Sequence, residues 1–234
     1  MTDRIAYWAV VPAAGAGKRM RADIPKQYLE IHQKSVLAHT IDRLLAHKQI
    51  AGVVVAISED DERWQTLSFS SDKPIITATG GEERHHSVQN ALDRLSTIAN
   101  EQDWALVHDA ARPCIRHEDI DQLINELRQH PVGGLLAYPV RDTMKRANES
   151  SEVIQTVNRA ALWHALTPQM FRIKPLRDAL QAVMDNNVPV TDEAAAMEYL
   201  GLAPKLVLGH ADNIKITTPE DLQLAAFYLG KIAT

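Results

Sequence analysis

The chain has 234 residues, of which 45% are apolar and 24% charged, as is typical of a globular protein with a hydrophobic core. Its net charge of −5 argues against a general attraction to nucleic acid or anionic membranes, so a polyanionic ligand needs a local cluster of cations. A single cysteine, Cys114, excludes a disulfide within the chain and a cysteine-based zinc site.

Short apolar runs alternate with helical patterns along the chain. The alternation predicts strands over residues 7–13, 52–58, 74–78, 104–108, 134–139 and 205–208. It predicts helices over residues 36–46, 87–98, 118–128, 175–184, 192–200 and 220–229. The runs around Val10 and Val54 are apolar on both faces, as in parallel strands covered by helices. We therefore predict an α/β fold, a Rossmann-like doubly wound and mainly parallel sheet, forming one domain over residues 1–234.

Residues 140–157 break this rhythm. Polar and apolar positions alternate there on both sides of a polar turn at residues 148–151, which predicts a β-hairpin. Because a lone hairpin is marginally stable in water, we expect residues 140–158 to protrude as an arm that packs on a second copy in a homodimer. A surface excursion without a partner is the alternative.

The longest apolar runs are strand-sized, far short of the roughly 20 residues that a membrane-spanning helix needs. The amino-terminal residues contain no long apolar segment of the secretory kind. With one cysteine, this pattern predicts a cytoplasmic protein that binds neither membranes nor nucleic acid.

A turn of small residues follows the first predicted strand, between Val11 and Met20. Small residues let the backbone approach a ligand, and successive N–H groups can form a concave anion site. A Walker A loop is excluded, because Pro12 and Arg19 stand where that loop needs glycine and a hydroxyl residue. A dinucleotide fingerprint is disfavoured, because Met20 occupies the place of its third small residue.

Three cations accompany this turn: Lys18, Arg19 and Lys26. Pro25 makes an uninterrupted helix between them unfavourable, so both ends of the segment can fold over one ligand. A triphosphate attacked at its α-phosphorus needs such cations, because charge moves toward the leaving pyrophosphate. A solvated basic loop is the alternative.

Two aspartates follow predicted strands. Asp109 ends a buried strand, at the edge of the sheet where ligands collect, and can hold Mg²⁺ on a triphosphate. Its alternative role is a cap or an ion pair with Arg112. Asp212 precedes Lys215 after the last strand, and spacing alone favours a turn aspartate beside an exposed lysine. The ten histidines form no metal or nucleophile set, and none is assigned chemistry.

Eight short segments are distributed over nearly the whole chain, in the order VPAAGAGKRM, PKQYL, GGEER, VHDAARP, PVRDTMKR, LWHALTPQ, TDEA and ADNIKIT. In this order they resemble the 2-C-methyl-D-erythritol 4-phosphate cytidylyltransferase family of the non-mevalonate isoprenoid pathway. The resemblance implies joining of this acceptor to CTP with release of pyrophosphate, aided by Mg²⁺ or another divalent cation. Ribitol 5-phosphate is the alternative polyol phosphate. A nucleotide sensor and a dinucleotide oxidoreductase are rivals from other classes.

The resemblance also assigns roles to residues. Catalysis falls to Arg19, Lys26, Arg159 and Lys215, and the metal to Asp109 and Asp212. Nucleotide binding falls to Pro12, Ala13, Ala14, Gly15, Ala16, Gly17, Lys18, Gly81, Glu82, Ser87 and Asp109. Substrate binding falls to Ala110, Arg112, Thr143, Thr167 and Thr191.

Three of these assignments carry more detail. The turn at Gly81 is expected to recognise the cytosine edge through backbone groups and the start of the helix at Ser87. Thr143 and Arg159 are expected to reach the acceptor phosphate from the partner subunit, since arginine suits bidentate phosphate contact. Without the resemblance, Thr191 is interpreted as a helix cap.

Overall fold

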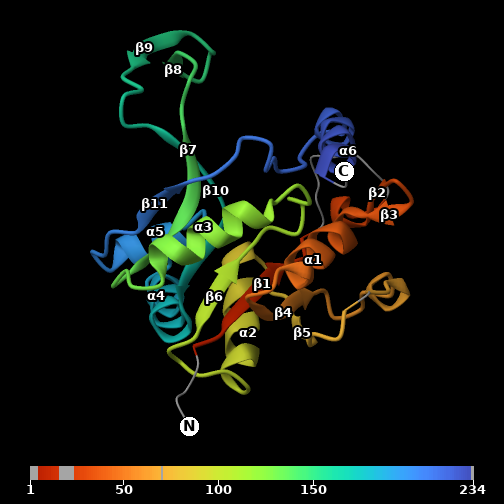
Figure 1. Ribbon diagram of the computed structural model, residues 1–234. Coiled ribbons are helices and arrows are strands. Elements are labelled where there is room, and N and C mark those ends of the chain that lie inside the picture. Colours follow the sequence, from red (N-terminus) through yellow and green to blue (C-terminus); the bar gives the residue numbers. More distant parts are fainter. Residues whose placement is uncertain (1–4, 16–23, 70, 233–234) are drawn as a thin grey trace.

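The computed structural model describes residues 5–15, 24–69 and 71–232 (Figure 1). A seven-stranded sheet has the order β11-β7-β10-β6-β1-β4-β5. Its strands are β1 (Tyr7–Pro12), β4 (Ile50–Ile57), β5 (Ile75–Thr79), β6 (Trp104–Val107), β7 (Gly133–Pro139), β10 (Trp163–Arg172) and β11 (Lys205–Leu208). Neighbours pair in parallel, except that β10 runs antiparallel to both β6 and β7.

Helices cover both faces of this sheet. They are α1 (Val36–Ala46), α2 (Arg84–Ser96), α3 (His117–Leu127), α4 (Ile173–Asp185), α5 (Glu193–Tyr199) and α6 (Pro219–Ile232). Strand β1 shows the division: Ala9 and Val11 pack in the core with α1 and α3, whereas Val10 packs with α2, α4 and α5. A strand alternates its side chains between two apolar layers, so the doubly wound prediction is confirmed.

All six predicted strands and six predicted helices are present, with ends displaced by a few residues. Strand β10 was missed, although it lies in the middle of the sheet. The reason is Pro168, which has no N–H for a strand ladder and argues against a central strand. In the structure the pairing of β10 with β7 shifts register between Ala165 and Gln169, so the proline sits at an irregularity, with a cis Thr167–Pro168 peptide.

Smaller elements complete the chain. Strands β2 (Glu30–Ile31) and β3 (Lys34–Ser35) form a short hairpin, and two 3-10 turns are η2 (Lys26–Tyr28) and η3 (Trp64–Thr66). Helix α6 packs Ala225 and Leu229 against Ile31 and Val36, which join it to the start of α1. No helix in the described part of the chain is both long and apolar enough to span a membrane.

Strands β8 (Met144–Ala147) and β9 (Val153–Val157) pair antiparallel, apart from the main sheet (Figure 1). The turn between them is closed by Asn148, whose N–H donates to the carbonyl of Glu152 at 3.0 Å. Val153 and Ile154 are exposed, at 62% and 61%. A hairpin with solvated apolar side chains lacks a core of its own, and its use as a dimer contact stays a prediction.

Candidate functional site

A cavity of about 540 Å³ lies where several strands of the sheet end; we call it the first cavity. Residues that directly follow β1, β5 and β6 line it, together with η2 and the segment before α6. This is the carboxyl edge of the parallel strands, where open α/β sheets bind ligands. The lining residues are Pro12, Ala13, Ala14, Gly15, Lys26, Gln27, Gly81, Glu82, Glu83, Arg84, Ser87, Asp109, Ala110, Ala111, Lys215 and Thr217.

The small-residue turn forms one wall of the first cavity. Gln27 fixes the backbone of this turn, because its side-chain amide donates to the carbonyl of Ala13 at 2.6 Å and to that of Gly15 at 3.0 Å. The predicted residues Pro12, Ala13, Ala14 and Gly15 line the cavity. The predicted residues Ala16, Gly17, Lys18 and Arg19 lie outside the described residues.

An adjacent wall is the turn between β5 and α2. The N–H of Gly81 donates to Ser87 Oγ at 3.0 Å, which fixes the turn against the start of the helix. Gly80 faces the other wall, because a Cβ there would lie 2.2 Å from the Cβ of Ala14. Only glycine permits the two walls to approach so closely. The predicted residues Gly81, Glu82 and Ser87 all line the cavity.

Three cations converge on Asp109, whose side chain is 9% exposed. Its carboxylate accepts from Arg84 Nε at 3.0 Å, Lys215 Nζ at 2.9 Å and Arg112 Nε at 3.3 Å. Burial alone would raise the pKa of Asp109, but Arg84, Lys215 and Arg112 outweigh it and hold that pKa well below its ordinary value. The site therefore keeps one ionised carboxylate among several positive charges.

Lys26 and Lys215 both line the cavity, although they lie far apart in the sequence. Lys26 Nζ donates to the carbonyl of Ile216 at 2.8 Å, across a separation of 190 residues. The adjacent Lys215 pairs with Asp109, so both lysines line the same space as the small-residue turn. These two catalytic predictions are brought together by the tertiary structure.

Arg84 is a site residue that the sequence interpretation missed. Its guanidinium donates to both oxygens of Glu193, at 2.6 Å and 3.2 Å, while its Nε reaches Asp109. Glu193 is fully buried. The charges of Glu193 and Asp109 overcome the effect of burial and raise the pKa of Arg84. Both residues belong to quoted segments, GGEER and TDEA, but no local pattern pairs residues 109 positions apart.

Two predicted substrate-binding residues lie behind the first cavity. Thr167 is buried, and its hydroxyl accepts from the N–H of Asp109 at 3.1 Å. Arg112 is also buried and donates to the carbonyl of Asn213 at 2.6 Å. Of the described lining residues, Ala110 is the predicted substrate-binding residue that faces the space.

Three other predicted residues lie away from the first cavity. Thr143, Arg159 and Thr191 are exposed. Arg159 donates to the carbonyl of Arg141 at the base of the hairpin. Interpreting Thr191 as a helix cap is wrong, because Asp192 caps α5 and accepts from the N–H of Ala195 at 3.0 Å.

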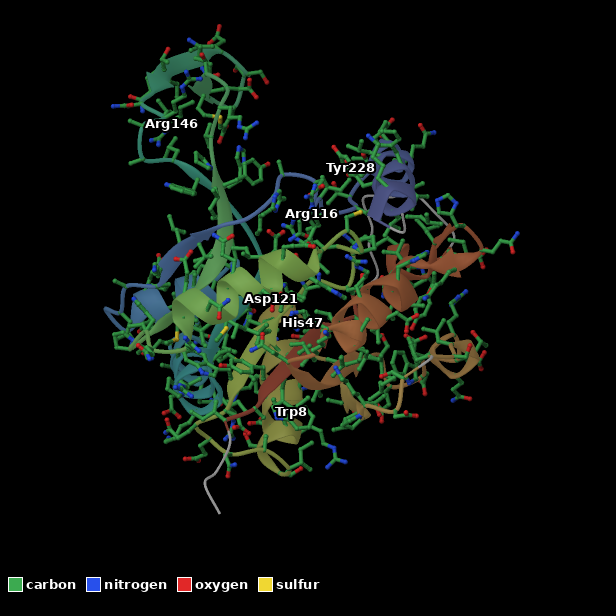
Figure 2. The ribbon with its side chains drawn as sticks, in the orientation of Figure 1. Trp8, His47, Arg116, Asp121, Arg146 and Tyr228 are labelled. Carbon is green, nitrogen blue, oxygen red and sulfur yellow. The ribbon has the colours of Figure 1, made fainter. Side chains whose placement is uncertain are left out.

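Asp212 lines a second cavity, of about 520 Å³, between α1, the start of α3 and α6. Its carboxylate forms a bidentate ion pair with the guanidinium of Arg116, including a contact of 3.0 Å from Nε. Figure 2 labels Arg116 and Tyr228, which both line this second cavity. Asp109 and Asp212 thus face different spaces, and within the described residues no group of three acidic, histidine or cysteine side chains could hold a metal.

Together these features define a class of protein. A doubly wound sheet carries a small-residue turn and converging lysines at its carboxyl edge, an arrangement that suits the phosphates of a nucleotide. Arg84, Arg112 and Lys215 outnumber the Asp109 carboxylate that they contact, and positive charge of this kind suits transfer of a phosphate-linked group more than hydride transfer. The chain therefore has the features of a nucleotidyltransferase.

Comparison with known proteins specifies the family. Residues 7–231 match the family model of 2-C-methyl-D-erythritol 4-phosphate cytidylyltransferase. A relative of that name from Vibrio vulnificus is 56% identical over 223 residues, covering 95% of this chain and 94% of its own length. A relative from Vibrio cholerae is 53% identical over 228 residues, covering 95% and 96%. The chain belongs to this family.

Solved structures agree. The crystal structure of a 4-diphosphocytidyl-2C-methyl-D-erythritol synthase has a TM-score of 0.83 and 36% identity, covering 97% of this chain and all of the other. The cytidylyltransferase of Francisella tularensis has a TM-score of 0.82 and 35% identity, covering 95% and 99%. The likeness therefore includes the whole arrangement of the sheet and helices.

Proposed function

We propose that this chain joins the 4-phosphate of 2-C-methyl-D-erythritol 4-phosphate to the α-phosphorus of CTP, releasing pyrophosphate. The observation that carries the proposal is the meeting of Lys26 and Lys215 with the small-residue turn in the first cavity. The names of the relatives support this acceptor over ribitol 5-phosphate.

The chemistry needs positioning and charge more than proton transfer. The acceptor phosphate is already an anion, so it can attack in line without a general base. The bond from the α-phosphorus to the bridging oxygen breaks, and negative charge collects on pyrophosphate. Lys26 and Lys215 line the cavity where preorganised positive charge stabilises that change. Arg19, outside the described residues, is proposed to act with them.

The cytosine is proposed to lie against the turn that contains Gly81 and Glu82. This wall combines backbone groups with the Ser87 hydroxyl, which accepts from Gly81 and is within 3.3 Å of the carbonyl of Glu83. These contacts fix the shape of the turn, and its remaining backbone groups are proposed to contact the base edge. The triphosphate then extends toward the lysines.

Mg²⁺, or another divalent cation, is proposed to bind Asp109 together with triphosphate oxygens. Magnesium is commonly held by one or two carboxylates plus phosphates, and the low pKa of Asp109 keeps its carboxylate ionised. When bound, the ion would neutralise charge on the triphosphate. Asp109 would have to release one of its contacts with Arg84, Arg112 or Lys215 to hold the ion. Asp212 as second ligand would have to leave Arg116, so its role stays a prediction.

The acceptor site is proposed to be completed by a second copy. Thr143 and Arg159 are exposed at the hairpin and its base, where they do not line the first cavity. Exposed apolar side chains on β9 support a contact between two hairpins in a homodimer. We further propose that residues 1–234 act as one domain in the cytoplasm, with residues 140–158 as the dimerisation arm.

Pyrophosphate release tests this function. Each of the four nucleoside triphosphates is incubated with Mg²⁺ and either 2-C-methyl-D-erythritol 4-phosphate or ribitol 5-phosphate. We expect efficient release only with CTP and the methylerythritol acceptor. Release of pyrophosphate with ribitol 5-phosphate at a higher kcat/KM would overturn the choice of acceptor. Binding of CTP without pyrophosphate release would indicate a nucleotide sensor.

A further inference from the structure

His108 is a buried histidine beside the first cavity with no role in the sequence interpretation. It follows β6 and directly precedes Asp109, and its side chain is 0% exposed. It does not belong to the described lining of the cavity, so a bound nucleotide would not touch it there. Any influence on the reaction must pass through its neighbours.

Both ring nitrogens of His108 have hydrogen-bond partners. Nε2 lies 2.9 Å from the carbonyl of Arg112, and Nδ1 lies 3.0 Å from the hydroxyl of Thr167. A carbonyl can only accept, so Nε2 must carry the hydrogen. In the neutral ring Nδ1 is then an acceptor, and Thr167 donates to it. One tautomer satisfies both contacts.

The same hydroxyl fixes the backbone of the site. Thr167 Oγ accepts from the N–H of Asp109 at 3.1 Å while giving its own hydrogen to His108. The ring therefore orients the hydroxyl so that its lone pair faces the Asp109 amide. With Nδ1 protonated, the hydroxyl would have to receive hydrogens from both sides and its own hydrogen would lose this partner.

A second connection runs through Arg112. His108 Nε2 donates to the carbonyl of Arg112. The guanidinium of Arg112 contacts Asp109 and donates to the carbonyl of Asn213. Asn213 Nδ2 in turn donates to the carbonyl of Thr167 at 2.7 Å. These buried contacts link His108, Arg112, Asn213 and Thr167 in a ring beside Asp109. Among the described residues Asn213 Oδ1 has no hydrogen-bond partner, whereas both ring nitrogens of His108 have one, so the contacts of His108 are the satisfied part of this ring.

We infer that His108, as its Nε2–H tautomer, is a positioning residue for the Asp109 carboxylate and the Arg112 guanidinium. The inference rests on the proposed function, because Asp109 must have a reaction to serve. His108 acts through Thr167 and through the Arg112 carbonyl, and it takes no part in proton transfer. Groups that orient a metal ligand or charged side chain from behind typically change activity by about 10–100-fold when altered.

The test compares one substitution that removes both contacts with two substitutions that keep one contact each. His108→Phe removes both contacts with a ring of similar shape. His108→Asn puts an acceptor near the Nδ1 position, so the Thr167 contact can persist. His108→Gln puts a donor near the Nε2 position, so the Arg112 contact can persist. We expect kcat to fall about 10–100-fold in His108→Phe, with KM for CTP changed less than about threefold. His108→Asn should recover most of the loss.

His47→Phe is the matched control. His47 is also a buried histidine; it directly follows α1, and its Nε2 lies 3.2 Å from the carboxylate of Asp121 on α3 (Figure 2). Neither residue lines the first cavity. This variant should lower Tm without lowering kcat measured below its melting temperature. Equal kcat losses in the two phenylalanine variants would overturn the inference, as would normal kcat in His108→Phe or no recovery in His108→Asn.

A measurement without turnover separates this inference from the proposed function. In ¹⁵N-labelled protein at pH 7, we expect the His108 Nδ1 shift of an unprotonated nitrogen and the Nε2 shift of a protonated one. The opposite tautomer would overturn the inference. Absence of pyrophosphate release by the unaltered protein would instead defeat the proposed function, while the nitrogen shifts still report on His108.

Discussion

The two cavities have similar volumes, about 540 and 520 Å³, and each holds an aspartate paired with an arginine. They differ in how the charges are held. Asp109 is 9% exposed and contacts three cations from separate segments, one of which is tied to the buried Glu193. Asp212 in the second cavity is 13% exposed and pairs with Arg116, whose side chain is 37% exposed. Ion pairs excluded from water have a stronger Coulomb interaction. The number of linked ion pairs and their burial therefore distinguish a candidate site better than cavity volume does.

The largest contrast between the cavities should come from their lysines. Lys26→Ala removes a preorganised donor from the first cavity, and we expect kcat for pyrophosphate release to fall by about 10²–10³-fold. Lys231→Ala removes a lysine from the second cavity and should leave kcat within about twofold of the unaltered protein. Circular dichroism should show both variants folded. A near-normal kcat for Lys26→Ala would remove this lysine from the mechanism.

Stability should separate the two aspartates. Asp109→Asn leaves three cations facing one another without their carboxylate, and we expect the free energy of unfolding to fall by about 3 kcal/mol. Asp212→Asn breaks a more solvated pair and should cost about 1 kcal/mol or less. Denaturant unfolding measures both. Equal losses would show that burial of the pair around Asp109 is unimportant.

The same comparison predicts a dependence on pH. The pKa of Asp109 is lower in the folded chain than in the unfolded chain, so its contribution is fully present above the unfolded value of about 4. It is lost as the pH falls from that value toward the lower folded pKa. The stability difference between the unaltered protein and Asp109→Asn should therefore be constant from pH 8 to 5 and shrink below about pH 4. A difference that shrinks between pH 7 and 5 would contradict the depressed pKa.

Arg159, at the base of the hairpin, is an exposed cation that can be compared with the cations lining the first cavity. Arg159→Ala should raise KM for the acceptor by about tenfold, while KM for CTP changes little, since a charge-assisted contact to phosphate is lost. Mixing this variant with Lys26→Ala should restore activity in mixed dimers, because one shared site keeps both residues. If mixing restores nothing, the acceptor site is not shared between subunits.

The smallest effect is expected for Arg116→Ala, which frees Asp212 from its ion pair. We expect kcat within about twofold of the unaltered protein, because Arg116 lines only the second cavity among the described pockets. Asp212→Asn sharpens the result: a kcat loss of about tenfold or more would indicate that Asp212 reaches the metal during the reaction. Equal, small changes in the two variants would confine Asp212 to the second cavity.

Local patterns predicted most of the architecture. Two-sided apolar runs such as Val53 to Val55 identify strands covered on both faces, and Ser35 caps α1 where the helical period begins. The small-residue turn and Lys26 were also recognisable, because close backbone approach and a nearby cation are features of adjacent residues. Strand β10 was not predicted, because Pro168 lacks the N–H that a strand ladder needs. In the fold, β7 pairs with β10 on both sides of the register shift at this proline.

What the sequence alone determined is the order of strands and helices, the turn, and membership of a family through ordered segments. The tertiary structure decided which charges share a space: Lys26 with Ile216, Arg84 with Glu193, and Asp212 with Arg116 instead of Asp109. Periodicity and turn chemistry act between near neighbours along the chain. An ion pair forms between groups that the sheet order brings together, and that order depends on the packing of the whole molecule.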